Sequence, residues 1–208
     1  MSLPSMDEVK EAIFTIHKDS AHGPNGFGSG FYQSCWEIIK DDLLKAAVEF
    51  VAGAHLDKAY TSSLLVLIPK SNDINNWKDF RPISLTNVKM KFLSKIIVNR
   101  LRNVLPNIIS HNQTGFVPGR GIVDNILLAQ ELFHTINSGK RGANIALKLD
   151  MEKTYDRVEW KFMIKMLNSL KFSASFCNVI YNSISNSWFS ILINGQQSDF
   201  FYYTRFLK

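Results

Sequence analysis

The stretch 144–158 limits the fold most narrowly, because it reads as a short strand that ends on a carboxylate and then turns into a helix. Apolar residues alternate with other residues over 144–149, and this period of two is typical of a strand with one buried face. The alternation places Asp150 at the mouth of a sheet. A carboxylate there suits Mg²⁺, which prefers one or two carboxylates together with phosphate oxygens and water. The alternative is an aspartate that only caps the following helix.

Helical periodicities and turn-rich connections organise the rest of the chain. Ser5 is a candidate N-cap of the first helix, and Asn194-Gly195 is typical of a two-residue hairpin turn. The pattern predicts helices over 5–18, 31–54, 88–105, 123–136, 159–170 and 176–185, strands over 62–69 and 188–193, and loops over 21–30, 77–87 and 114–121.

Basic residues are concentrated in one part of the chain. The stretch 70–102 carries eight basic and two acidic residues, and its net charge of +6 equals that of the whole chain. Such a concentration is the electrostatic footprint of a phosphate-backbone partner, although a solvated helix face would give the same composition. On the helix over 88–105, Lys91, Lys95 and Arg102 fall on one side at 100° per residue.

The two cysteines, Cys35 and Cys177, lie far apart and lack metal-ligand spacing. This usage indicates a reduced, intracellular protein, with nucleus and cytoplasm not distinguished. The first ten residues are polar and mixed in charge, unlike a signal peptide. The densest apolar run, 64–68, is too short to span a bilayer.

Several motifs follow one another along the chain. They are the loop Gly23-Pro24-Asn25-Gly26-Phe27, the strand end Leu67-Ile68-Pro69-Lys70, the run Phe80-Arg81-Pro82-Ile83-Ser84-Leu85-Thr86-Asn87, the stretches 95–101, 113–120 and 124–131, and Leu149-Asp150 with Tyr155. In this order the chain resembles the reverse transcriptase domain of non-LTR retrotransposons, especially the plant LINE-type group. The resemblance covers nearly the whole chain.

The resemblance implies an α+β fold, the fingers and partial palm of a right-hand polymerase. The expected architecture is helix-rich with a small, incomplete antiparallel sheet. About 1–140 would form the fingers and connecting helices, and about 141–208 would form the start of the palm with its first metal-binding motif.

The resemblance also gives each candidate residue a role. Asp150 matches the first metal-binding aspartate of the palm, and the Met151 backbone carbonyl is an additional ligand of the metal at the nucleotide site. Tyr155 matches the aromatic gate under the incoming sugar, where a ring leaves no room for a 2′-hydroxyl. Lys70 and Arg81 match the finger residues that hold the triphosphate, Arg with a fork of donors and Lys as a point charge. Without the resemblance, Tyr155 would read as a core aromatic and the two cations as exposed surface charges.

The implied reaction is template-directed addition of a dNTP to a primer 3′ end. The primer 3′-oxygen attacks the α-phosphate in line, pyrophosphate leaves, and two Mg²⁺ ions stabilise the attacking and leaving oxygens. The implied partners are an RNA template, a DNA primer and dNTPs, with no membrane partner. We expect Lys91, Lys95, Arg102 and Arg120 to contact the template or primer backbone, which positions nucleic acid without reading its sequence.

The sequence departs from the family pattern at three places. Thr154 stands where family members commonly have Ala, and Asn25 stands where they usually have Asp. After Phe201, the family's Arg-Gly-Leu-Arg-Gln-Gly-Asp-Pro block and its later hairpin with paired aspartates do not follow. The dipeptide Asp41-Asp42 falls in an early helical stretch and does not replace them.

We therefore expect a truncated domain that is inactive as a polymerase by itself, because one carboxylate cannot organise two metals at one centre. A degenerate retrotransposon remnant and a partial gene model would both give this sequence. The competing functional hypothesis is a non-catalytic RNA- or DNA-binding module that uses the basic surface. A third hypothesis is an unfolded product without a role.

Overall fold

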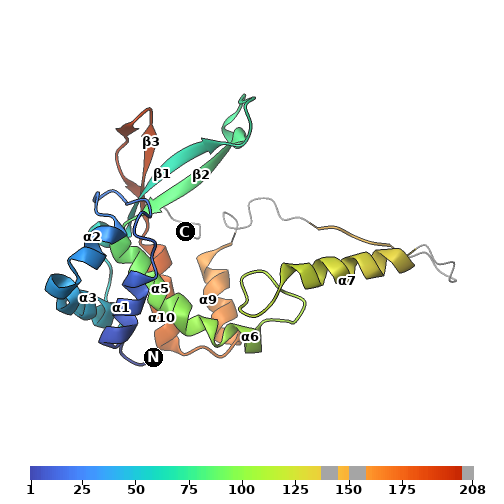
Figure 1. Cartoon of the computed structure of the whole chain (residues 1–208), viewed down its shortest axis with the longest axis horizontal. Coiled ribbons are helices and arrows are strands. Elements are labelled where there is room, and N and C mark those ends of the chain that lie inside the picture. Colours follow the sequence, from blue (N-terminus) through green and yellow to red (C-terminus); the bar gives the residue numbers. More distant parts are fainter. Residues whose placement is uncertain (137–144, 150–157, 203–208) are drawn as a thin grey trace. The chain divides into compact units, whose positions relative to one another are not determined.

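The computed structural model describes residues 1–136, 145–149 and 158–202. The chain forms two compact units, one of residues 1–97 with the segment from residue 154 onward, and one of residues 98–153. Over the described residues the fold is α+β, as predicted, with nine α-helices and one five-stranded sheet (Figure 1). None of these described helices is both long and apolar enough to cross a bilayer.

The first unit begins with three helices, α1 (Met6–Phe14), α2 (Ser29–Ser34) and α3 (Trp36–Val51). The predicted N-cap is confirmed, because the Ser5 hydroxyl accepts the Glu8 N–H at 3.2 Å. The helix predicted over 31–54 is two helices. The chain breaks at Cys35, whose ψ of 10° departs from helical geometry.

The core of the first unit lies among α1, α3, α5 (Val88–Arg102) and α10 (Ala174–Ser185), which gather below the sheet in Figure 1. Apolar side chains spaced three and four apart on each helix point into it. The largest fully buried apolar side chains are Val9, Ile13, Phe50, Val88, Phe92, Leu93, Ile96 and Val179.

The sheet has the strand order β2-β1-β3-β4, with β5 (Phe201–Tyr202) also paired to β3. The strands β1 (Ser62–Pro69) and β3 (Trp188–Ile193) occupy the ranges predicted from the sequence. They run parallel, with Ser62 opposite Trp188, so the prediction of an antiparallel sheet is wrong and the sheet is mixed. The long connection between β1 and β3, which includes β2 and several helices, allows this pairing, since parallel neighbours need a crossover rather than a tight turn.

The strand β2 (Phe80–Thr86) corrects the prediction of a loop over 77–87. A short 3₁₀ turn, η1 (Trp77–Asp79), precedes it after the helical turn α4 (Lys58–Thr61) and β1. β2 pairs antiparallel with β1 and lies at the edge of the sheet. Because an edge strand leaves one row of backbone groups unpaired, it tolerates Pro82, which has no N–H to donate.

The C-terminal part of the first unit follows the predicted order. It contains α9 (Trp160–Ser169), α10, β3 and β4 (Gln196–Gln197). The predicted hairpin turn is confirmed. Asn194 and Gly195 have φ values of 50° and 78°, and β3 pairs antiparallel with β4 across them.

The second unit contains the end of α5, then α6 (Leu105–Ile108) and α7 (Ile122–Thr135). The segment 145–149 is extended chain without regular structure, so the strand predicted over 144–149 is wrong for the described residues. Its apolar side chains are exposed, and none of the described strands pairs with it. The alternating pattern is present, but within the part of the chain that the structure describes no neighbouring strand takes up its backbone hydrogen bonds.

Candidate functional site

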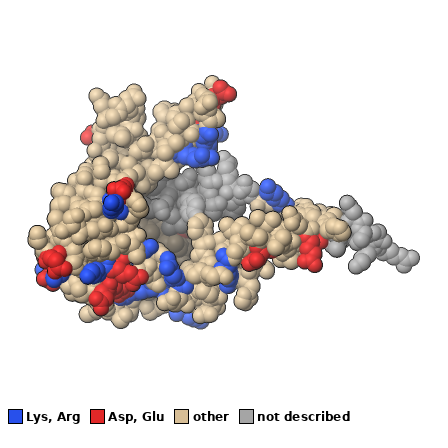
Figure 2. Space-filling view, in the orientation of Figure 1, with Lys and Arg blue, Asp and Glu red and all other residues tan. Residues whose placement is uncertain are grey.

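The β1–β2 hairpin brings together two predicted site residues, Lys70 and Arg81. Arg81 lies opposite Ile68 in the ladder. The Lys70 N–H donates to the Asp79 carbonyl at 2.8 Å, which continues the pairing one residue beyond the end of the ladder on each strand. Side chains two residues apart on a strand share a face, so Lys70 and Arg81 project from one side of the hairpin end. Both side chains are exposed. In Figure 2, blue basic atoms lie near this end and red acidic atoms at its tip.

The turn that closes this hairpin is held by one carboxylate. Asp79 accepts the backbone N–H groups of Asn75 and Asn76 at 2.9 and 2.8 Å. These two hydrogen bonds favour the ionised form and lower the pKa of Asp79. The Lys70 ammonium donates to the Lys78 carbonyl at 2.6 Å, so the turn also orients the lysine.

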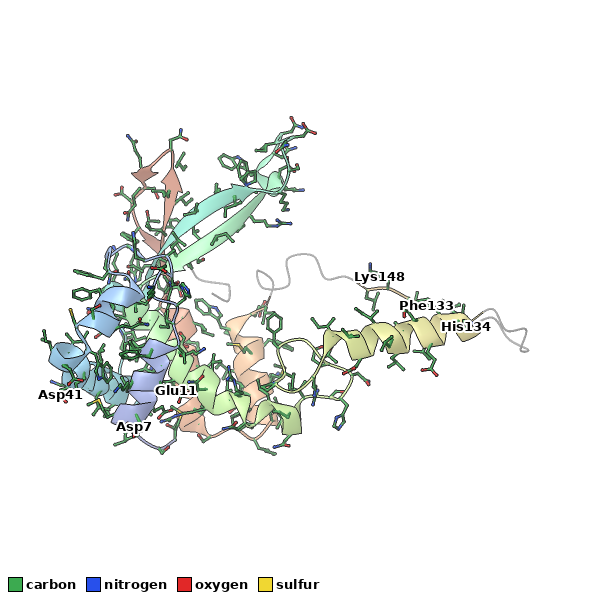
Figure 3. All side chains as sticks on the ribbon, in the orientation of Figure 1. Asp7, Glu11, Asp41, Phe133, His134 and Lys148 are labelled. Atoms are coloured by element: carbon green, nitrogen blue, oxygen red, sulfur yellow. The ribbon has the colours of Figure 1, made fainter. Side chains whose placement is uncertain are left out.

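Asp150, Met151 and Tyr155 lie outside the described residues, so the structure does not place the predicted metal and sugar-gate residues. Figure 3 marks Lys148 on the described segment that leads toward them. Among the described residues, no group of three or more His, Cys, Asp or Glu side chains is arranged to hold a metal. The predicted ligands, a carboxylate and a backbone carbonyl, are both oxygen donors and are therefore chemically suited to Mg²⁺.

The three basic residues predicted to form a stripe stand on α5 in different surroundings. Lys91 is half-buried, and its ammonium donates to the Ala21 carbonyl at 2.6 Å and the Ser20 hydroxyl at 3.1 Å. Burial lowers the pKa of Lys91. Lys95 is half-buried and Arg102 is exposed. Lys91 therefore links α5 to the loop that contains Ser20 and Ala21. Arg102, by contrast, is accessible to a partner.

Arg120, also predicted to contact nucleic acid, organises its own loop. Its guanidinium donates to four backbone carbonyls, those of Ser110 at 2.5 Å, Gln113 at 2.8 Å, Pro106 at 2.9 Å and Ile109 at 3.0 Å. A rigid fork of donors suits such a set of acceptors. Nothing in the sequence indicates these acceptors, because they are brought to Arg120 by the fold of the loop, and the predicted nucleic-acid contact of Arg120 stays a prediction.

A buried asparagine, which the sequence reading did not single out, joins two further motifs. Asn87 is 2% exposed, accepts the Asn25 N–H at 3.1 Å and donates to the Ala59 carbonyl at 2.9 Å. Gly23 lies directly against it, and a Cβ on Gly23 would fall 2.4 Å from the Asn87 nitrogen. The Gly23-to-Gly26 turn is closed by a 3.1 Å hydrogen bond between its end residues. In the sequence, Asn87 is marked only by its place at the end of the motif over 80–87.

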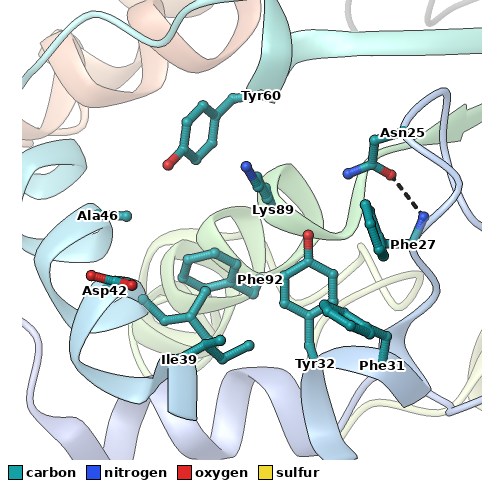
Figure 4. A pocket seen from close by; sticks show the side chains of 11 residues that line it. Asn25, Phe27, Phe31, Tyr32, Ile39, Asp42, Ala46, Tyr60, Lys89 and Phe92 are labelled. Atoms are coloured by element: carbon teal, nitrogen blue, oxygen red, sulfur yellow. Dashed lines mark hydrogen bonds between the residues drawn. The ribbon is translucent and has the colours of Figure 1, made fainter. Parts of the chain in front are cut away.

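These contacts build the walls of a half-open cavity of about 390 Å³ in the first unit. The turn at residues 23–27, the start of α2, α3, Tyr60 and the first turns of α5 surround it. Burial raises the pKa of both Tyr32 and Tyr60. Figure 4 shows the side chains that matter most, Asn25, Phe27, Tyr32, Asp42, Tyr60 and Lys89.

Comparison with known families gives a match to the C-terminal two-thirds of the chain. A sequence model of the family described as reverse transcriptase (RNA-dependent DNA polymerase) matches residues 68–208. The matched region includes the β1–β2 hairpin end, the helix α5 and the 113–120 loop.

Curated relatives come from mobile elements and extend the similarity toward the N-terminus. The transposon TX1 uncharacterized 149 kDa protein of Xenopus laevis is 29% identical over 191 residues, which are 91% of this chain and 14% of that protein. A Pol polyprotein from the type-1 retrotransposable element R2 of Nasonia vitripennis is 27% identical, over 88% of this chain and 17% of the relative. The R2DM polyprotein of Drosophila melanogaster is 24% identical, over 93% of this chain and 18% of the relative. The chain spans less than a fifth of the length of these relatives.

Proposed function

This chain belongs to the reverse transcriptase (RNA-dependent DNA polymerase) family, and we propose that it forms the nucleotide-gripping part of a non-LTR retrotransposon reverse transcriptase. Residues up to about 140 act as fingers and connecting helices, and the later residues begin the palm. Within the family the motif order favours the plant-like LINE group. The similarity to the TX1 and R2 proteins supports the retrotransposon assignment.

This proposal rests on the arrangement of side chains at the end of the β1–β2 hairpin. Two cations of different geometry share one exposed face, and Asp79 and the Lys78 carbonyl fix the turn beside them. A triphosphate presents several anionic oxygens, so the Arg81 fork and the Lys70 point charge can engage it together. Charge on the leaving phosphates is thereby offset by groups already in place.

The palm residues keep the roles that the family resemblance implies. Asp150 and the Met151 carbonyl hold Mg²⁺, which in this chemistry offsets the charge that develops on phosphate oxygens. Tyr155 packs under the sugar and excludes a 2′-hydroxyl. The primer 3′-oxygen, the template and the incoming dNTP are the proposed reaction partners.

A nucleotide photoprobe tests the hairpin assignment. A dATP analogue with an azidoanilide on its γ-phosphate reports where the triphosphate tail lies, and labelled peptides are identified by mass spectrometry. We expect labels on residues between Lys70 and Arg81 that are competed by unmodified dATP. Labelling confined to other peptides would refute the assignment.

We further propose that the 208-residue polypeptide alone does not extend primers. One aspartate and one carbonyl supply too few anionic ligands for two metal ions at an in-line centre. Primer extension with Mg²⁺ and dNTPs on purified polypeptide should give no template-dependent product. Products that disappear in Asp150→Ala would disprove this part of the proposal.

Nucleic-acid binding without catalysis is the second candidate, and the exposure of Arg102 on α5 favours it. Phosphate contacts release counterions, so affinity for RNA should fall with salt. Arg102→Glu should weaken binding and flatten that salt dependence, whereas Lys91→Glu would also break the contacts with Ser20 and Ala21. Binding that is indifferent to salt and to Arg102→Glu would remove this candidate.

A further inference from the structure

The cavity behind the Gly23-to-Gly26 turn is a ligand site in its own right. We propose that it binds one unstacked base of single-stranded nucleic acid, an inference that rests on the proposed function only for the presence of a nucleic-acid partner. Its volume of about 390 Å³ lies within the range of about 300 to 1,000 Å³ found for small-molecule sites. It is partly open to solvent, so a base can enter while its strand remains outside.

Five aromatic side chains contribute to its lining. Phe27 and Phe31 are 48% and 44% exposed at the rim, with ring centres 4.7 Å apart. Tyr32 and Phe92 are buried below them, and Tyr60 comes from a separate element, α4. A flat ring of any base can stack on such faces, and this is how proteins hold single strands without strong sequence preference.

The polar groups of the cavity favour a neutral ligand with hydrogen-bonding edges. The Lys89 ammonium lies 5.1 Å from the centre of the Tyr60 ring, and the Asp42 carboxylate lines the same space. One cation and one anion among the lining residues leave no net charge to attract a phosphate. Together with the hydroxyl groups of Tyr32 and Tyr60, they offer donors and acceptors to a base edge.

The walls are fixed before any ligand arrives. Asn87 bonds the turn that carries Asn25 and Phe27 to the Ala59 carbonyl, next to Tyr60. The Asn25 side chain in turn accepts the Phe27 N–H at 3.2 Å, drawn as the dashed line in Figure 4. Two motifs far apart in sequence therefore hold opposite sides of one cavity, and this preorganisation lowers the cost of binding.

Fluorescence anisotropy on the full chain tests the proposal with two probes, a short single-stranded oligo(A) RNA and a strand of equal length that carries abasic sites. The wild-type chain should bind the base-bearing strand more tightly. Phe27→Ala and Lys89→Met should each reduce that preference about fivefold or more. Lys45→Met removes the same charge from an exposed position outside the cavity and should leave the preference unchanged.

Equal binding of both strands by the wild-type chain, or an unchanged preference in Phe27→Ala, would overturn the proposal. If free adenosine competes with the strand and binds as tightly as the strand does, the cavity is a site for a free nucleoside. That result would overturn the proposal that its ligand is a strand. Because Phe27 is half-exposed, Phe27→Ala should leave the fold intact. The test therefore stays valid even if Lys89→Met lowers the melting temperature.

The two proposals fail separately. Absence of photoprobe label between Lys70 and Arg81, with the base preference still dependent on Phe27, would remove the proposed function alone. Normal labelling of the hairpin with no base preference would remove only the cavity proposal.

Discussion

The Arg120 guanidinium donates hydrogen bonds to backbone carbonyls of its own loop. Arg120→Lys keeps the positive charge, but an ammonium cannot reach the same four acceptors. We expect the loop around residues 106–120 to lose about 2 kcal/mol of local stability. Hydrogen exchange of its amides measures this loss directly.

The control for this prediction is Arg102→Lys, which changes an exposed arginine of the same unit. It should leave amide protection in the loop unchanged. If Arg120→Lys also leaves protection unchanged, the four hydrogen bonds do not hold the loop.

Asp79 makes the hairpin turn sensitive to pH. Folding lowers the pKa of this carboxyl through the Asn75 and Asn76 amides, so the ionised form favours the ordered turn. That contribution is complete above the ordinary range of Asp and is lost as pH falls through the lowered pKa. The amide shifts of Asn75 and Asn76, followed by NMR during acidification, should titrate with a midpoint below that of an ordinary aspartate. The same transition in Asp79→Asn would contradict this prediction.

At the scale of elements, the Gly23-to-Gly26 turn requires that the backbone at Gly23 lie close to the backbone of Thr86 and Asn87. A Cβ at Gly23 would lie 2.4 Å from the Asn87 nitrogen and 2.6 Å from the Thr86 carbonyl carbon, which are backbone atoms with little room to move. Gly23→Ala should therefore destabilise the first unit by about 1 to 3 kcal/mol. Gly28→Ala is the matched control, because its nearest neighbour would be 4.0 Å away. Urea denaturation should separate the two variants, and equal midpoints would contradict the packing argument.

The elements that sequence patterns predicted best were those whose signal is local. β1 has a run of β-branched and leucine residues ended by Pro69, and β3 ends in an Asn-Gly turn, so both ranges agree with the structure. β2 was missed because Pro82 and Arg81 resemble a loop, and only pairing with β1 makes them a strand. The parallel pairing of β1 with β3 joins residues more than a hundred positions apart, which no local pattern encodes.

At the scale of the whole molecule, motif order identified the family and singled out Lys70 and Arg81, which the structure places on one hairpin. It could not show that Asn87 links the first motif to the third, because that link is a tertiary contact of a buried side chain. It also could not show that the Arg120 guanidinium binds backbone carbonyls of its own loop. Asp150, Met151 and Tyr155 keep the roles proposed for them and await a direct test.

The central claim is that the hairpin end grips the triphosphate of a nucleotide, and equilibrium titration with dATP tests it most directly. Arg81→Ala and Lys70→Ala should each weaken binding about tenfold or more, since each removes a charge-assisted contact. Lys78→Ala removes an equal charge from the same turn while its carbonyl remains to accept Lys70, so its affinity should match that of the wild-type chain. Equal losses in all three variants, or no loss in Arg81→Ala, would contradict the claim.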